Sequence, residues 1–258
     1  MCYNVNYLTK KRLEYGRRLQ GLIDKSNLEN EFDDILQRTG PVYFVNGFNH
    51  PDVPVITNKM PDHIQTFSWG LIPFWVKDPK QAVSLSKMTL NARGEEIFKK
   101  PSFRNAARHK RCLVVIDGFF EYHWFNDKSY PYYIKLASDE PMLLAGLWET
   151  WNYTKENIVR YTFSIVTTRA NPMMAYIHNK PKASEGPRMP VIVPKGSEKV
   201  WLTEIQDSVD QQLIEEIIQP YNENELQAFT VSKLQGKTGI GNVPEAIQEY
   251  HYNELGTK

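Results

Sequence analysis

Cys2 is the residue with the most distinctive chemistry in this 258-residue chain. An initiator methionine is commonly removed when the next residue is small, which would leave Cys2 with a free α-amine beside its thiol. Because an α-amine titrates near pH ~7.7–8.0, part of it is an unprotonated nucleophile at neutral pH. With an aldehyde the amine forms an imine, and the thiol then closes onto it intramolecularly to give a thiazolidine ring. Cys2 therefore predicts aldehyde capture, whereas an internal cysteine gives only a reversible hemithioacetal.

Three polar residues elsewhere have side chains that could assist such a reaction. Asn91 brings an amide close to the guanidinium of Arg93. Glu121 ends an apolar, aromatic-rich run, and a carboxyl group in such surroundings suits acid–base catalysis. His178 ends a predicted short helix, where it serves either as an acid–base group or as a partner of the helix dipole. Taken singly, each of these residues fits a structural role better than a catalytic one.

A rigid aromatic segment and a basic window indicate a nucleic-acid surface. The segment Trp69–Trp75 places two indoles around a proline-stiffened turn, and unpaired bases can stack on such a surface. The window Lys99–Arg111 holds six Lys or Arg and no acid, whereas residues 200–232 hold seven carboxylates and no Lys or Arg. One basic and one acidic face fit a polyanion footprint, although each run alone is more typical of a solvated helix surface.

Other functional motifs are incomplete. Gly236-Lys237-Thr238 matches the end of a phosphate-binding P-loop, but Val231 stands where that loop needs glycine. Cys2 and Cys112 are the two cysteines, and they give neither a disulfide framework nor, with the histidines, a complete set of metal-ligand spacings. The sequence therefore predicts no metal and no cofactor.

The composition is that of a folded protein, with 24% charged, 41% hydrophobic and 12% aromatic residues and a net charge of +1. A chain of this length buries a full core without disulfides. It has no apolar stretch long enough to cross a membrane, and its start lacks the order of a signal peptide, so we expect a cytoplasmic location. We find no internal repeat or Gly/Ser linker, which favours a single domain over residues 1–258.

A mixture of strands and helices must position these side chains. Strands are predicted where β-branched and aromatic residues cluster between turn formers, at residues 111–120, 142–148, 161–168 and 189–193. Helices are predicted where apolar residues recur at helical spacing or an Asn-Pro pair opens the helix, at residues 28–38, 171–177 and 207–218. Because strands and helices do not alternate regularly, an α+β fold is favoured over a doubly wound parallel sheet.

In combination, the motifs resemble those of the SRAP family (SOS-response-associated peptidases, or abasic-site processing proteins). The matching segments occur in the family's order: Met1-Cys2, Trp69–Trp75, Asn91–Glu95, Arg111-Cys112 leading into Asp117–Glu121, Ala145–Trp148, Thr167-Thr168, and His178 followed by Arg188–Pro190. They span residues 2–193, and residues 194–258 match less distinctively. The resemblance implies a mixed, largely antiparallel, curved or barrel-like β core flanked by helices, with a helical or irregular C-terminal extension packed on it.

The resemblance also implies a role in DNA repair. Proteins of this family bind abasic sites in single-stranded DNA and crosslink to the ring-opened sugar aldehyde through an N-terminal cysteine. By this resemblance Cys2 is the nucleophile, exposed when the protein removes its own Met1. Asn91 would position the amine or the sugar oxygens. Glu121 and His178 would exchange protons during ring opening, imine formation and reversal.

The resemblance assigns the DNA contacts to two groups of side chains. Phosphates would be held by Arg93, Arg104, Arg111 and Arg188, with Lys110 as a weaker contact, and Thr167 is a further expected DNA contact. Neighbouring bases would stack on Trp69, Pro73 and Trp75. The expected partner is single-stranded or junction DNA containing an abasic site, bound by a monomer that associates with the nucleoid when DNA is damaged.

Two places depart from the family pattern. Tyr3-Asn4 stands where many relatives have Gly-Arg, which removes a phosphate contact beside the nucleophile. Nine residues, 179–187, separate His178 from Arg188 where relatives commonly have one. The added loop carries Lys180 and Lys182, which would either contact phosphates or remain solvated.

Two other functions are compatible with the sequence. A thiol hydrolase could use Cys2, His178 and Asn91 on peptides, and it would need the thiolate but not a free α-amine. A non-catalytic single-strand-binding module could rest on the basic window and the segment Trp69–Trp75, and it would have no use for Cys2.

Overall fold

The computed structural model describes residues 2–180 and 186–256. The strands are β1 Asn4–Tyr7, β2 Val42–Asn46, β3 Asp52–Thr57, β4 Met60–Trp69, β5 Asn91–Arg93, β6 Arg111–Ile116, β7 Gly118–Phe125, β8 Lys128–Leu136, β9 Met142–Tyr153, β10 Ile158–Arg169, β11 Arg188–Pro190 and β12 Leu226–Thr230. The α-helices are α1 Arg12–Arg18, α2 Lys25–Thr39, α3 Pro79–Met88, α4 Arg104–His109, α5 Pro172–Ile177, α6 Glu198–Leu202 and α7 Ser208–Ile217.

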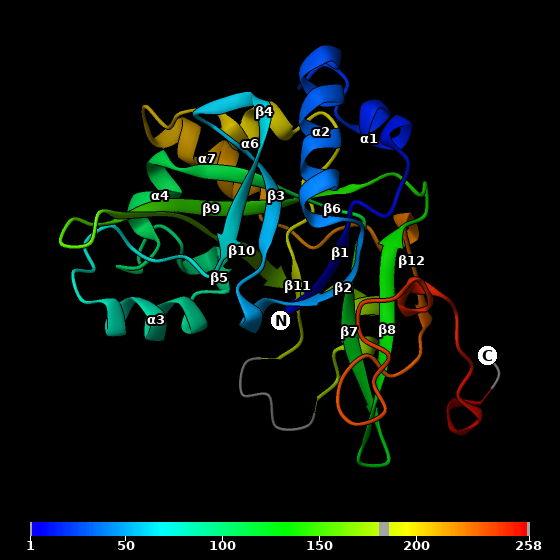
Figure 1. The fold of residues 1–258 in the computed structure, drawn as a ribbon. Helices are drawn as coiled ribbons and strands as arrows, with labels where there is room; N and C mark the ends of the chain where they lie inside the picture. Colours follow the sequence, from blue (N-terminus) through cyan, green and yellow to red (C-terminus); the bar gives the residue numbers. More distant parts are fainter. Residues whose placement is uncertain (1, 181–185, 257–258) are drawn as a thin grey trace.

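Five strands close into a mixed barrel (Figure 1). Strand β10 pairs with β4 in parallel, and the antiparallel pairs β4–β3, β3–β6, β6–β9 and β9–β10 complete the ring. Strands β5 and β11 are added to β10, the first in parallel and the second antiparallel. Every residue of β6 is buried, and from Cys112 to Ile116 the strand is a continuous apolar run rather than an alternating one.

A second sheet, entirely antiparallel, has the strand order β12-β8-β7-β1-β2. Its β7–β8 hairpin extends away from the barrel, and the C-terminal segment lies along it (Figure 1). Strand β1 lies in this sheet between β7 and β2. The α+β fold with a mixed, barrel-like β core flanked by helices is thus confirmed.

Asp117 and Gly118 form the junction between the barrel and the second sheet. The Asp117 carboxylate accepts hydrogen bonds from Thr9 N and Oγ1, both at 2.7 Å, and from Tyr15 Oη at 2.5 Å. A Cβ at Gly118 would lie 2.5 Å from the Tyr133 ring, so only glycine fits there. The strand predicted over residues 111–120 is therefore two strands, because Asp117 bonds to the N-terminal segment instead of continuing the ladder.

The helices follow local sequence signals. In α2 the buried residues Leu28, Phe32 and Ile35 lie on one face, and this helix packs on β4. In α5 the side chain of Asn171 accepts from Met174 N at 2.8 Å, so the Asn-Pro pair caps the helix as predicted. The predicted helices at residues 28–38, 171–177 and 207–218 are confirmed as α2, α5 and α7.

Residues after 194 contribute to the second sheet as well as to the helical layer. Besides α6 and α7 they supply β12, which pairs with β8. The chain then returns to the opposite edge of this sheet, where Asn242 Oδ1 accepts from Tyr43 N at 2.7 Å and from Phe44 N at 3.1 Å. In the described part of the chain, no helix is long and apolar enough to cross a membrane.

Candidate functional site

Cys2 is fully buried where the second sheet meets the barrel. Asn91, the first residue of β5, donates from Nδ2 to Cys2 O at 2.8 Å. The other amide atom, Asn91 Oδ1, is also buried and has no hydrogen-bond partner among the described residues. Since buried polar atoms are nearly always paired, this acceptor marks a place for a donor group beside Cys2.

The surroundings of Cys2 keep its thiol protonated. Burial raises the pKa of the Cys2 thiol far above its usual value, and the negative charge of Glu121 raises it further. A hydrogen bond from the backbone of Asn4 has the opposite, smaller effect. Tyr3 lies near Glu121 as well, and its ring packs on that of Phe48 with 5.0 Å between the ring centroids. These surroundings therefore favour the neutral, protonated form of the Cys2 thiol.

Glu121 and His178 lie beside each other in this site. Strand β7 supplies Glu121, which is only 8% exposed, and His178 follows the last residue of α5. His178 Nδ1 lies 3.6 Å from Glu121 Oε2 and 3.0 Å from Arg188 O. The structure thus brings together the four residues predicted from the sequence, in the order Asn91, Cys2, Glu121 and His178.

Arg188 connects the strands and the turn that carry the site residues. Its Nη2 donates to Glu95 Oε2 at 2.7 Å and to Thr167 O at 2.9 Å. Arg188 is 7% exposed and Thr167 is fully buried. These contacts tie β11 to β10 and to the turn after β5, so Arg188 and Thr167 hold the elements that carry Asn91 and His178.

The structure corrects five of the predicted DNA contacts, because Trp69, Pro73, Arg111, Thr167 and Arg188 are all buried. Trp69 is fully buried, and its Nε1 donates to Leu90 O at 2.7 Å. Arg111 is fully buried as well, with its guanidinium donating to the backbone carbonyls of Ala107, Arg108, Trp201 and Thr203. Trp69 and Arg111 therefore stabilise the core, and neither side chain is available to DNA.

Other predicted contacts differ in accessibility. Pro73 is buried, so it shapes the turn before Trp75 without offering a surface for stacking. Lys110 forms an ion pair with the buried Glu149, and its Nζ lies 5.2 Å from the centre of the Trp148 ring. Arg104 is exposed at the start of α4, and Arg93 is half-buried in β5.

An exposed groove lies beside the predicted aromatic segment. It has a volume of about 590 Å³ and is lined by Phe74, Trp75, Pro101, Arg104, Asn105, Arg108 and His109. Trp75 is 41% exposed and Phe74 is 55% exposed. We call this the Trp75 groove. Of its residues, the sequence predicts Trp75 and Arg104 individually, and the other five lie within the aromatic segment or the basic window.

The loop after His178 begins on the β7–β8 hairpin. Asn179 Oδ1 accepts from Trp124 N at 2.7 Å, and its Nδ2 donates to Trp124 O at 3.0 Å. Lys180 Nζ lies 5.6 Å from the centre of the Trp124 ring. Lys182 lies outside the described residues. Over the described ranges, no group of three His, Cys, Asp or Glu side chains is arranged to hold a metal ion.

Fold and site together define an α+β protein whose buried near-terminal cysteine is surrounded by an amide, a carboxyl and an imidazole group. The chain belongs to the SOS response associated peptidase (SRAP) family, whose sequence profile matches residues 15–238.

Several named proteins are similar to this chain. The abasic site processing protein YoqW of Bacillus subtilis is 34% identical over 234 residues, covering 86% of this chain and 97% of YoqW. The abasic site processing protein HMCES of Xenopus tropicalis is 29% identical over 154 residues, which cover 52% of this chain and 43% of HMCES. A crystal structure of a Bacteroides thetaiotaomicron protein has a TM-score of 0.80 and 31% identity, covering 97% of this chain and all of that one.

Proposed function

We propose that this protein recognises abasic sites in single-stranded DNA and becomes covalently linked to them through Cys2. The observation that carries the proposal is the enclosure of Cys2 by Asn91, Glu121 and His178, with one amide oxygen of Asn91 left as an unused acceptor. The names of similar proteins, which include abasic site processing proteins from bacteria and vertebrates, support the substrate.

The reaction needs no oxidant and releases one water. The α-amine of Cys2 adds to the C1′ aldehyde of the ring-opened deoxyribose, and the resulting carbinolamine loses water to form an imine. The Cys2 sulfur then bonds to the imine carbon while the thiol proton moves to the nitrogen. Because the thiol starts protonated, the proton required by the nitrogen is already in the site. The product is a thiazolidine between protein and DNA.

Each neighbouring residue has a role that suits its position. Asn91 Nδ2 fixes the Cys2 carbonyl, and its buried Oδ1 accepts from the Cys2 amine or from a sugar hydroxyl. Glu121 and His178 transfer protons during ring opening and dehydration of the carbinolamine. The amine exists only after hydrolysis of the Met1–Cys2 peptide bond, and we assign this step to the protein itself.

The DNA strand would reach this site along the Trp75 groove. Phe74 and Trp75 offer aromatic faces for unpaired bases, while Arg104 and Arg108 provide positive charge for phosphates. Arg93, next but one to Asn91 in β5, would hold a phosphate near the lesion. Single-stranded DNA fits these contacts because its bases are free to stack.

Hydrolysis of peptide substrates by Cys2 is less well supported. A thiol protease needs a nucleophile whose pKa is lowered toward neutrality. Here burial and the charge of Glu121 raise the pKa of the Cys2 thiol instead. A neutral thiol suits capture of an imine better than attack on an amide.

Intact-protein mass spectrometry tests the proposal. The protein is weighed before and after incubation with a single-stranded oligonucleotide carrying one abasic site, and the first spectrum confirms that Met1 has been removed. We expect a new species at the mass of protein plus oligonucleotide minus one water, absent with undamaged DNA. A chain that lacks Met1 and still gives no adduct would refute the proposal.

Replacing Trp75 with alanine should weaken binding of undamaged single-stranded DNA about fivefold to tenfold, because one base–aromatic stack is lost. Fluorescence anisotropy with a labelled oligonucleotide measures this change. Tyr161→Ala is a matched control, since Tyr161 is a 50% exposed aromatic residue in β10, outside the groove. Equal affinities of the two variants would remove Trp75 from the DNA path.

A further inference from the structure

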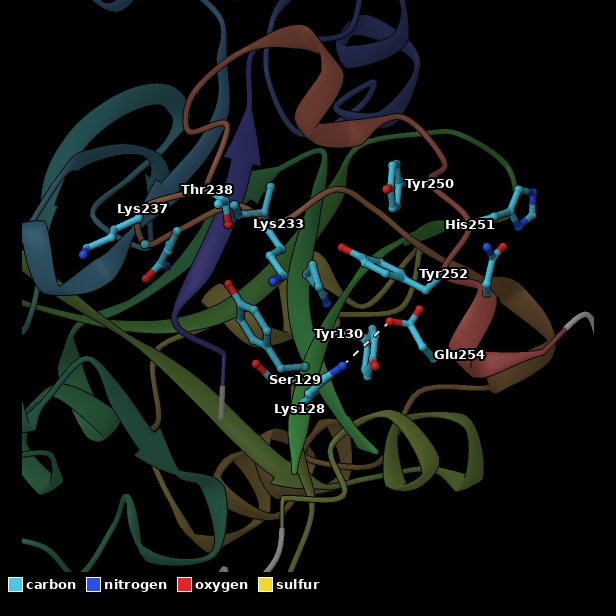
Figure 2. A pocket seen from close by; sticks show the side chains of 16 residues that line it. Lys128, Ser129, Tyr130, Lys233, Lys237, Thr238, Tyr250, His251, Tyr252 and Glu254 are labelled. Carbon is cyan, nitrogen blue, oxygen red and sulfur yellow. Dashed lines mark ion pairs between the residues drawn. The ribbon is translucent and has the colours of Figure 1, made fainter. Parts of the chain in front are cut away.

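A second pocket lies on the far side of the β7–β8 hairpin from the Cys2 site. Successive side chains of a strand point to opposite faces, so Tyr122 faces away from the side to which Glu121 points. Tyr122 lines a cavity of about 820 Å³ enclosed by the hairpin, the loop 233–238 and the tail 250–254 (Figure 2). We call it the tail pocket. Residues 250–254 lie beyond the part of the chain that matches the family profile.

The tail pocket is positively charged, although the whole chain has a net charge of only +1. Lys128, Lys233 and Lys237 line it, against a single carboxylate, Glu254. Lys128 Nζ is 3.9 Å from Glu254 Oε1, and both side chains are exposed, so this ion pair is weak. Within the described residues, Lys233 and Lys237 have no carboxylate at ion-pair distance. Figure 2 shows Lys128 and Lys233 directed toward the middle of the pocket.

Tyrosine rings form the opposite wall. The centre of the Tyr252 ring lies 4.9 Å from that of Tyr130 and 4.8 Å from that of Tyr250. Tyr252 is held in place because its Oη donates to Val231 O at 2.9 Å. Tyr250 is 48% exposed and leaves an aromatic face open. Tyr122 also lines the pocket, and its buried Oη has no hydrogen-bond partner among the described residues.

We propose that the tail pocket binds a short segment of single-stranded DNA, with phosphates on Lys128 and Lys233 and a base stacked on Tyr250. Amines and aromatic faces together match the two parts of a nucleotide, and the cavity has the size of an ordinary ligand site. The pocket needs neither an abasic site nor Cys2. The lysines and tyrosines alone indicate a nucleic-acid strand, and the choice of DNA over RNA rests on the function proposed for Cys2.

The position of the pocket supports a strand rather than a free nucleotide. Gln235, in the pocket wall, donates from Nε2 to Asn4 Oδ1 at 3.0 Å. Asn4 opens β1, two residues after Cys2. The wall of the pocket is thus hydrogen-bonded to the strand that follows Cys2, so a bound DNA chain could occupy both sites at once.

The test compares two double variants in binding undamaged oligothymidylate across a range of salt concentrations. We expect K128A/K233A to raise the dissociation constant about fivefold to tenfold and to reduce the slope of log affinity against log salt by about 1.4, since each phosphate contact contributes about 0.7. K155A/K199A removes the same charge from exposed sites outside the pocket and should leave the slope near that of the wild type. Tyr250→Ala should weaken binding about fivefold with no change of slope.

Equal affinity and slope for the two double variants would overturn the proposal. So would a rise in melting temperature with thymidine 5′-monophosphate that K128A/K233A abolishes while oligothymidylate affinity is unchanged, because that result identifies a free-nucleotide site. Crosslinking to an abasic strand is scored separately. Its absence would contradict the function proposed for Cys2 and leave the binding measurements on the tail pocket valid.

Discussion

Replacing Cys2 with serine should abolish the stable adduct with abasic DNA while preserving a transient one. Serine at position 2 still presents an α-amine after Met1 is removed, so the imine forms. The hydroxyl group closes the ring far less effectively than the thiol, and the imine therefore hydrolyses. Without reductant, we expect loss of essentially all crosslinked protein, seen on a denaturing gel or by intact mass. With borohydride, which reduces the carbon–nitrogen double bond, the adduct should return with two additional hydrogens.

Cys112→Ala provides the matched control. Cys112 is the second buried cysteine, and it lies in β6 of the barrel. This variant should crosslink like the wild type, since its remaining thiol and amine are those of Cys2. A stable adduct formed by Cys2→Ser without reductant would show that the thiol is not part of the product.

Replacing Asp117 with alanine should lower the free energy of unfolding by about 3–5 kcal/mol, because buried donors lose a carboxylate acceptor. The carboxylate is fully buried and accepts three hydrogen bonds, from Thr9 N, Thr9 Oγ1 and Tyr15 Oη. Burial raises the pKa of the Asp117 carboxyl group, an effect that the hydrogen bonds from Tyr15 and Thr9 oppose. Without those bonds, the segment after β1 loses its attachment to the junction between the sheets.

Urea denaturation followed by circular dichroism measures this effect. Asp33→Ala serves as control, because Asp33 is an exposed carboxylate in a surface ion pair with Arg12 and should change stability by less than about 0.5 kcal/mol. If Asp117→Ala unfolded at the same urea concentration as Asp33→Ala, the junction would not depend on this carboxylate.

The parts of the fold that the sequence predicts are those with strong local signals. Helix α2 has a regular apolar stripe, and α5 has an Asn-Pro start. Strand β8 was not predicted because it contains Pro131 and several polar residues, which are unusual inside a strand. The break at Asp117 was also missed, since the reason for it is a set of contacts with residues more than one hundred positions earlier in the chain.

The candidate site was predicted more completely than the DNA contacts. The grouping of Cys2, Asn91, Glu121 and His178 rests on the resemblance to the SRAP family. Motifs that occur in a family's order indicate that residues far apart in the sequence lie close together in the fold. Exposure, however, cannot be read from residue type. Trp69 ends a barrel strand with its indole inside, whereas Trp75 lies in the following loop with its indole partly outside. Only the packing around each side chain separates a core tryptophan from a surface one.

The burial of Cys2 has a consequence for chemical selectivity inside a cell. An N-terminal cysteine in open solution condenses with any small aldehyde, so metabolites such as formaldehyde would inactivate it. Here Cys2 is fully enclosed, and access requires local displacement of the surrounding side chains. A DNA strand contributes binding energy to that displacement, whereas a free aldehyde contributes almost none. Under the proposed function, enclosure therefore protects the amine and thiol of Cys2 from small aldehydes until DNA is bound.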